Sequence, residues 1–232
     1  MVTKNFGDRI QDINASIQFI NNPWFQAIFN HDFTREQILT GEIQHYLRVR
    51  TNSRFLGNLV ASAEEQWDYA TFEVARENYR DEICGKRSHS DLMYAMLQED
   101  MGKSDIAQRE PTSGTMAALA MLTSASTQFS PLAQLAIFAL PELQYGGENG
   151  IAAQMYKVLT QDYGFSHQAA ITYYVHERAD AEHGPKALDY IIERVNAQPK
   201  KETEVLRALK YGLVAFNYAW DGSHQAAIGN ER

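Results

Sequence analysis

The chain has 232 residues, of which 44% are hydrophobic and 22% are charged, proportions typical of a globular protein with one sizeable core. Its formal net charge of −8 argues against binding to nucleic acids or anionic membranes, because both need clustered positive charge. No apolar run reaches the roughly 20 residues of a transmembrane helix, and the N-terminus lacks the apolar core of a signal peptide. The single cysteine, Cys84, allows no intrachain disulfide, so we expect a cytoplasmic protein.

The first half of the chain has the three-to-four-residue apolar spacing that predicts α-helices. Isoleucines spaced through residues 10–20 predict a first amphipathic helix, and Pro23 begins a short second one that ends near Phe29. Thr34-Arg35-Glu36-Gln37 has the sequence of a capping box, which starts a long helix. We expect that helix to bend or break near Asn52-Ser53 and to resume to about Trp67.

The second half continues the helical pattern. Residues 102–114 are the most loop-like stretch, and we interpret them as a connection within one domain. The expected helices cover residues 68–84, a segment around 92–97, 115–129, a helix that begins at Ser130-Pro131, 151–163, one capped by Ser166, and a last one after the linker 198–201. The sequence therefore predicts a single all-α domain over residues 1–232, with about seven to nine helices.

The motif His176-x-x-x-Asp180-x-x-His183 carries the clearest chemical signal. Its members stand at i, i+4 and i+7, so an α-helix projects all three side chains from one face. Two imidazoles and a carboxylate form a ligand set suited to iron, manganese or zinc. The alternative is that the histidines are incidental and Asp180 is solvated.

A second pair, Glu82 and His89, also lies seven residues apart. Gly85 between them lowers helix stability by roughly 1 kcal/mol relative to alanine, and it could mark a distortion that directs both side chains to one point. The alternative is a helix that simply ends at Gly85 and is followed by a polar turn.

Glu142 stands in an otherwise apolar helix, where a carboxylate is costly to bury unless it is paired or bound to a cation. Glu148, among glycines, is the rival for the same role. Glu42 and His45 have the Glu-x-x-His spacing of ferritin-like di-iron bundles, but those bundles use it twice and this chain has no second copy. We therefore interpret Glu42 and His45 as a polar patch near a pocket or surface. The pocket candidates are Phe25, Glu42, His45, Tyr46 and Tyr173.

Taken together, these motifs resemble the haem-oxygenase-like superfamily of TenA-type thiaminases and pyrroloquinoline-quinone synthase. Its CADD-like branch of di-metal oxidases, named for a chlamydial protein associating with death domains, gives the strongest resemblance. The pattern Asn-x-x-Asp-Glu-x-x-Gly-x-x-x-His is matched by Asn78, Asp81, Glu82, Gly85 and His89, and the later motif by His176, Asp180 and His183. The likeness extends over about residues 20–220, and the two motifs together are specific although each alone is not.

The resemblance implies a helical bundle that holds two iron ions, or one iron and one manganese. Its implied ligands are Glu82, His89, Glu142, His176, Asp180 and His183. Such a centre would use dioxygen as co-substrate to oxidise a small organic molecule in an adjacent pocket. Related bundles often dimerise, so a homodimer is the expected assembly.

Two departures qualify the resemblance. CADD is linked to para-aminobenzoate formation at the expense of one of its own tyrosines, and this chain has Phe25 at the position aligned with that tyrosine. A second family tyrosine is replaced by Pro141. The alternatives are therefore a metal-independent enzyme, thiaminase-like or quinone-synthase-like, and a non-catalytic ligand-binding module. Cys84 lies outside the late helix in which the thiaminases carry their nucleophile.

Overall fold

The computed structural model describes residues 4–84, 87–100, 106 and 108–229, and within them every regular element is helical. The all-α prediction is confirmed for this part of the chain. The α-helices are α1 (Phe6–Ser16), α2 (Pro23–Phe29), α3 (Arg35–Val49), α4 (Asn52–Glu65), α5 (Tyr69–Ile83), α6 (His89–Asp100), α8 (Ser113–Gln128), α9 (Pro131–Tyr145), α10 (Ile151–Gln161), α11 (Ile171–Ala197) and α12 (Glu202–Ala227). Three short 3₁₀ helices, Phe19–Asn21, Gln168–Ala170 and Pro199–Lys201, join some of them.

Helix starts follow the predicted capping chemistry. The Thr34 hydroxyl accepts a hydrogen bond from the Gln37 backbone N–H at 3.3 Å, and the Gln37 side chain accepts from the Thr34 N–H at 2.9 Å. Ser130 precedes Pro131 at the start of α9, as predicted, although its hydroxyl donates to Glu204 instead of capping its own helix. These local signals fix where α3 and α9 begin.

The described residues form more α-helices than the seven to nine predicted, because short non-helical segments divide the chain more finely. Ile17 adopts an extended conformation that ends α1 at Ser16, so Ile20 falls in a 3₁₀ helix and not in the first helix. The break after α3 comes at Arg50–Thr51, just before the predicted Asn52-Ser53. The predicted loop lies only partly within the described residues, since 101–105 and 107 fall outside them.

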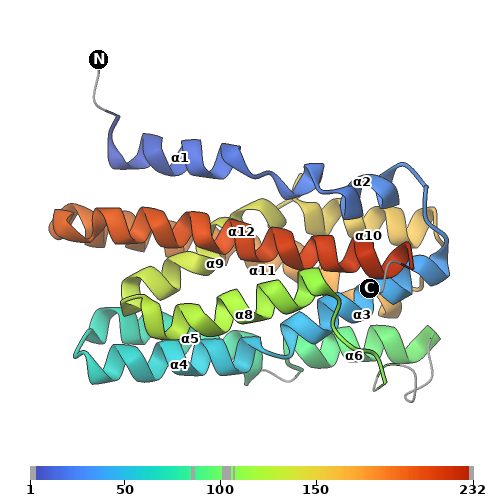
Figure 1. Cartoon of the computed structure of the whole chain (residues 1–232), viewed down its shortest axis with the longest axis horizontal. Coiled ribbons are helices and arrows are strands. Elements are labelled where there is room, and N and C mark those ends of the chain that lie inside the picture. The colour runs from blue at the N-terminus through green and yellow to red at the C-terminus, as the bar shows by residue number, and fades with distance from the viewer. Residues whose placement is uncertain (1–3, 85–86, 101–105, 107, 230–232) are drawn as a thin grey trace.

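The bundle is built around α12, which extends along the middle of the molecule with α1 and α2 on one side and α4 and α5 on the other (Figure 1). It packs against α8, α9 and α3, while α11 packs against α9. From Pro131 to Pro141 every residue of α9 is buried, as expected of a helix that is apolar on all sides. None of the described helices is long and apolar enough to cross a bilayer.

Pro141 interrupts the hydrogen bonding of α9 next to the bundle centre. Proline has no N–H, so it leaves the Ile137 carbonyl without its usual partner four residues later. Gly212 of α12 faces that carbonyl, and a Cβ at this glycine would lie far inside van der Waals contact with the Ile137 oxygen. Close approach of α9 and α12 therefore requires glycine at position 212.

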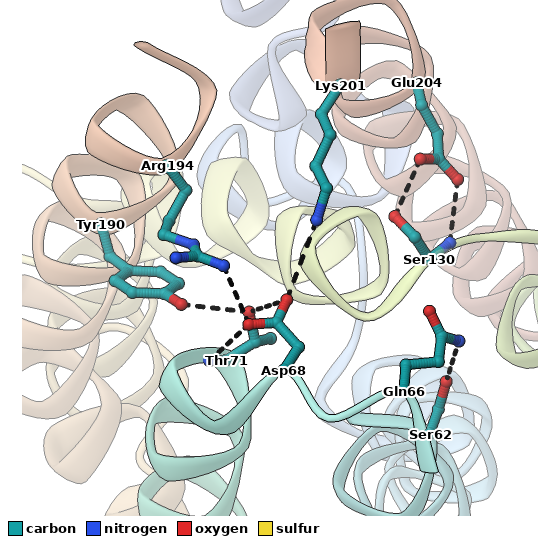
Figure 2. Close-up of polar contacts among 9 residues, drawn as sticks. All are labelled: Ser62, Gln66, Asp68, Thr71, Ser130, Tyr190, Arg194, Lys201 and Glu204. Carbon is teal, nitrogen blue, oxygen red and sulfur yellow. Dashed lines mark hydrogen bonds and ion pairs between the residues drawn. The ribbon is translucent and has the colours of Figure 1, made fainter. Parts of the chain in front are cut away.

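At the end of the bundle where α4 meets α5, a polar cluster connects α5, α11 and the 3₁₀ helix Pro199–Lys201 (Figure 2). Asp68 caps α5 through the Thr71 backbone N–H and accepts from the Arg194 guanidinium of α11 at 2.9 Å. The Thr71 hydroxyl lies 3.0 Å from the Tyr190 hydroxyl, and the Lys201 ammonium lies 3.9 Å from Asp68. The start of α5 is thus fixed to α11, which later carries the site histidines.

Gly212→Ala is expected to lower the free energy of unfolding by about 2 kcal/mol or more, because the added methyl group meets backbone and not a flexible side chain. Gly57→Ala is the matched control: its Cβ would meet only the Tyr79 ring at 3.6 Å, and alanine should stabilise α4 by roughly 0.5–1 kcal/mol. Urea unfolding of both variants measures the difference. Equal effects of the two substitutions would contradict this account of the α9–α12 contact.

Candidate metal centre

Three side chains from three helices converge at the centre of the bundle. Ligand-type atoms of Glu82, His89 and His176 all lie within 4.8 Å of one another. The rings of His89 and His176 have centroids 3.8 Å apart, and His89 Nδ1 lies 3.2 Å from Glu82 Oε2. One divalent cation could contact all three groups with small side-chain movements.

Glu82 and His89 meet because one helix ends and another begins between them. Glu82 is in the last turn of α5, which ends at Ile83, and His89 is the first residue of α6. The Ser88 hydroxyl accepts from the Asp91 N–H at 3.1 Å, and Asp91 accepts from the Ser88 N–H at 3.1 Å, so this pair caps α6. The seven-residue spacing therefore does not follow one continuous helix; Gly85, the suggested point of distortion, lies outside the described residues.

The close crossing of α9 and α11 brings two further carboxylates to the same place. A Cβ at Gly184 would lie 2.8 Å from the Leu143 nitrogen and 3.1 Å from the Glu142 carbonyl carbon, and one at Gly146 would overlap the backbone of Asp180. These glycines let the two backbones approach until Glu142 and Asp180 face one cavity. Asp180 is 5% exposed, and its Oδ1 lies 3.2 Å from His176 Nδ1.

Glu142 is the unusual member of this group. Its Oε2 is buried and has no hydrogen-bond partner among the described residues. Burial raises the pKa of its carboxyl well above the usual value, and the neighbouring charges of Asp180 and Glu82 raise it further. Glu148, the rival on the sequence, is exposed in the turn after α9. A bound cation would give Glu142 the partner it lacks.

His183 lies at the margin of the group. Its Nε2 is 3.7 Å from Asp81 Oδ2, its side chain is 21% exposed, and it does not line the central cavity. It is still close enough to lower the pKa of Glu82 by its charge. Five of the six predicted ligands thus surround one cavity, and the sixth stands beside it; the ligand set itself stays a prediction.

The charged groups of the site shift one another's pKa values. Burial favours the neutral form of Glu82, but the hydrogen bond to His89 and the charges of the nearby histidines outweigh it and lower its pKa to about 2. Burial and the charge of His176 lower the pKa of His89 to about 4. For His176 the loss of solvent is outweighed by Asp180 and Glu82, which raise its pKa to about 9. At neutral pH His89 is therefore neutral and His176 carries the proton.

The cavity between these helices has a volume of about 60 Å³, enough for roughly two water molecules. Its wall combines the five predicted ligand groups with apolar surface from α4, α9 and α12. The apolar part includes Leu56, Phe138, Phe216 and Trp220. Such a wall limits the access of bulk water to the polar cluster.

Among the predicted pocket residues, His45 and Tyr173 line the cavity and Glu42 lies directly behind them. The Tyr173 hydroxyl donates to Glu42 Oε1 at 2.5 Å, and His45 Nδ1 lies 3.0 Å from Glu42 Oε2. Burial raises the pKa of Glu42 to about 7. Glu42 and His45 thus form a buried connection between α3 and α11, which is more specific than the polar patch that the sequence suggested.

The other two pocket candidates do not reach the cavity wall. Phe25 is fully buried behind it, with its ring centroid 4.9 Å from that of Trp220 and 6.3 Å from that of Tyr145. Tyr46 packs against Tyr94 with ring centroids 5.6 Å apart.

Sequence reasoning missed several polar side chains of the wall, namely Arg48, Asn52, Tyr145 and Thr172. Two of these four residues could have been predicted from their spacing in the sequence. Arg48 follows His45 by three residues and Tyr145 follows Glu142 by three, so each shares a helix face with a predicted site residue. Thr172 had no such signal, because a single threonine in a helix is uninformative.

Comparison with known proteins agrees with this architecture. A family model described as iron-containing redox enzyme matches residues 43–216. The chain belongs to this family. The matched segment of the iron-containing redox enzymes spans all six predicted ligands and every residue of the cavity wall except Trp220.

Individual relatives of this redox enzyme are more distant. A 4-aminobenzoate synthase of Nitrosomonas europaea is 24% identical over 243 residues, covering 99% of this chain and 95% of the relative. A domain of unknown function with a haem-oxygenase-like fold from Shewanella denitrificans has a TM-score of 0.73 at 14% identity, covering 97% and 94% of the two chains. A CADD-like protein of unknown function from Nostoc punctiforme has a TM-score of 0.72 at 16% identity, covering 98% and 97%. The predicted haem-oxygenase-like fold and the likeness to CADD-like proteins are confirmed.

Metal uptake is expected to strengthen as pH rises. His176 carries a proton below its pKa of about 9, and an ion that binds its nitrogen must displace that proton. Affinity for Mn²⁺ should therefore increase at least about tenfold per pH unit between pH 6.5 and 8. Electron paramagnetic resonance of free Mn²⁺ measures it; an affinity independent of pH would refute the assignment of His176 as a ligand.

Glu42 should make the metal-free chain less stable as pH rises. Its pKa is about 7 in the folded chain and 4.5 in the unfolded reference, so the folded state holds the proton more tightly. The resulting stabilisation is complete below pH 4.5 and is lost as pH rises through 7. Relative to Glu42→Gln, wild type should lose roughly 2–3 kcal/mol between pH 5 and 8 in urea unfolding. Parallel pH profiles would count against a buried, protonated Glu42.

Proposed function

We propose that the chain is a non-haem di-metal oxidase or oxygenase that uses dioxygen to oxidise a small organic substrate. Membership of the iron-containing redox enzymes supports an iron-dependent redox reaction. The finer assignment, to two ions and to dioxygen, rests on the donor groups around the central cavity.

One observation carries this proposal: three carboxylates and three imidazoles line a single cavity at the centre of the bundle. Glu82, Glu142 and Asp180 influence one another's charge, and the Oε2 of Glu142 has no partner. A group of acids that repel one another within the protein interior is stabilised when cations bind among them. The donor set fits iron or manganese, since carboxylates suit the harder, oxidised ions and imidazoles suit iron in general.

We assign Glu82, His89 and His176 to the centre of the site, with Glu142, Asp180 and His183 completing two coordination shells. When bound, a pair of iron ions, or one iron and one manganese, would supply the redox chemistry with dioxygen. The protein would hold the ligands in place through the crossing of α9 and α11, and the apolar wall from α12 would keep bulk water away.

The Glu42–His45 pair would act as a positioning element for this site. Glu42 holds His45 Nδ1, and the His45 ring lies edge to face with His89 at a centroid distance of 6.1 Å. Tyr173, which donates to the same carboxylate, precedes His176 by one helical turn. Glu42 would therefore orient neighbours of both histidine ligands without touching substrate.

The Nitrosomonas relative, named a 4-aminobenzoate synthase, supports redox chemistry that involves a small aromatic acid. Consumption of an internal tyrosine is not part of the proposal, because Phe25 and Pro141 replace the two family tyrosines in this chain. An external small-molecule substrate is the simpler assignment.

Anaerobic loading with Fe²⁺ should give about two metal ions per chain, and exposure to oxygen should then produce a transient visible absorption. His176→Ala should abolish both, and His183→Ala should lower the metal content. His167→Ala is the matched control, because His167 is exposed and contacts Tyr156 away from the cavity. Elemental analysis and stopped-flow absorbance are the measurements; a wild-type chain that retains no metal would end this proposal.

The metal-independent alternative has a distinct signature. A thiaminase-like reaction would proceed in the presence of chelators and would need a nucleophile in the cavity. Cys84, the single cysteine, is exposed after α5 and is not among the cavity residues. Activity that survives chelation and the Cys84→Ser substitution but is lost in Glu142→Gln would favour a metal-free enzyme.

A further inference from the structure

Arg48 is a buried cation in the wall of the central cavity. It lies on α3, one turn after His45 and one turn before Asn52, and is only 3% exposed. Among the described residues its one side-chain hydrogen bond is long, from Nη1 to Asn52 Oδ1 at 3.5 Å, and its Nε has no partner. Among the residues that the structure describes, no carboxylate lies within ion-pair distance of it.

The surroundings of Arg48 compensate its charge only in part. Its guanidinium carbon lies 4.7 Å from the centroid of the Phe216 ring and 6.0 Å from that of Trp220, so the aromatic faces offer some stabilisation. The charges of Glu82 and Asp180 act on it from beyond contact distance. Burial nevertheless lowers the pKa of the guanidinium. A buried arginine without a paired anion is costly, and an anionic ligand beside it would remove that cost.

The same cavity holds other hydrogen-bond donors that lack acceptors. The Thr172 hydroxyl, on a residue 1% exposed, has no partner, and neither have the Tyr145 hydroxyl and the Trp220 indole N–H. Together with Arg48 Nε they give the residues of the wall four unsatisfied donors. Buried donors are normally satisfied, so this pattern indicates a ligand that brings oxygen acceptors.

We propose that Arg48 binds the carboxylate of the substrate, which makes the substrate a small monocarboxylic acid. The inference rests on the proposed function only in that the substrate occupies this cavity. The planar guanidinium matches a carboxylate in two parallel hydrogen bonds. The apolar body of the acid would lie against Leu56 and Phe138, and its free end would extend toward the histidine cluster.

Charge and size select this class over other anions. Arg48 is the one lysine or arginine among the cavity-lining residues that the structure describes, and Glu82 and Asp180 face the same space, so a doubly charged phosphate would be repelled. A cavity of about 60 Å³, or roughly two waters, is far too small for a long-chain fatty acid. A short aliphatic acid or a single-ring aromatic acid remains.

The test uses the full chain stripped of metal with a chelator, so that a carboxylate cannot bind through an ion. Isothermal titration with benzoate and benzamide, and with hexanoate and hexanamide, compares acids with uncharged analogues of similar shape. Each amide should bind about 30-fold or more weakly than its acid, and inorganic phosphate should not compete. Equal binding of acid and amide, absence of acid binding, or competition by phosphate would overturn the inference.

Substitutions then locate the anion. Arg48→Gln should weaken benzoate binding about 30-fold or more. Arg48→Lys keeps the positive charge but loses the planar guanidinium, so its affinity for benzoate should lie between those of wild type and Arg48→Gln. Arg50→Gln is the matched control, since Arg50 is exposed and packs on Tyr46 outside the cavity. Wild-type affinity in Arg48→Gln would refute the assignment. If Arg48→Gln does not fold, the Arg48 Nε–H resonance of wild type must shift when benzoate is added, and an unmoved resonance is equally decisive.

Metal content separates this inference from the proposed function. Arg48→Gln should take up iron like wild type, because Arg48 is not among the assigned ligands. A chain that binds acids through Arg48 but holds no metal would contradict only the oxidase proposal. A chain that holds two ions but binds acids no more tightly than their amides would contradict only the carboxylate site at Arg48.

Discussion

The approach of α9 to α11 is the constraint on which the centre of this molecule depends. Gly146 and Gly184 remove the two Cβ atoms that would keep these backbones apart, and Glu142 and Asp180 face each other as a result. The packing of small residues thus decides where the charged residues can meet.

The close approach of these side chains places like charges near one another, and packing alone does not remove their repulsion. Three carboxylates, three imidazoles and one guanidinium line a cavity of about 60 Å³ whose remaining wall is largely apolar. Protons relieve part of the repulsion, because His176 and Glu142 both have raised pKa values. Cations at the acids and an anion at Arg48 would relieve it more completely. The two proposals therefore describe complementary halves of one charge balance.

Much of this arrangement could be predicted from local sequence signals. The capping box of Thr34 and Gln37 fixes the start of α3, and Pro131 at the first helical position suits the start of α9. The face shared by His176 and Asp180 follows from helix geometry alone. The approach of Glu82 to His89 does not, because it depends on how α5 ends and α6 begins, and the role of Arg48 depends on which residues fail to pair with it. Such features arise from tertiary packing, and one sequence carries no direct record of them.

The placement of the ligands also has a consequence for assembly. Glu82 and His89 are near in the chain, but Glu142, His176 and Asp180 follow at separations of some fifty to a hundred residues, on α9 and α11. An ion that recruited these groups from the unfolded chain would have to close several long loops at once, each at an entropic penalty. The helices must therefore be assembled before the full ligand set exists. With these groups as its ligands, the bundle would act as a preformed chelator, and an ion would enter a structure that has already closed around the place it will occupy.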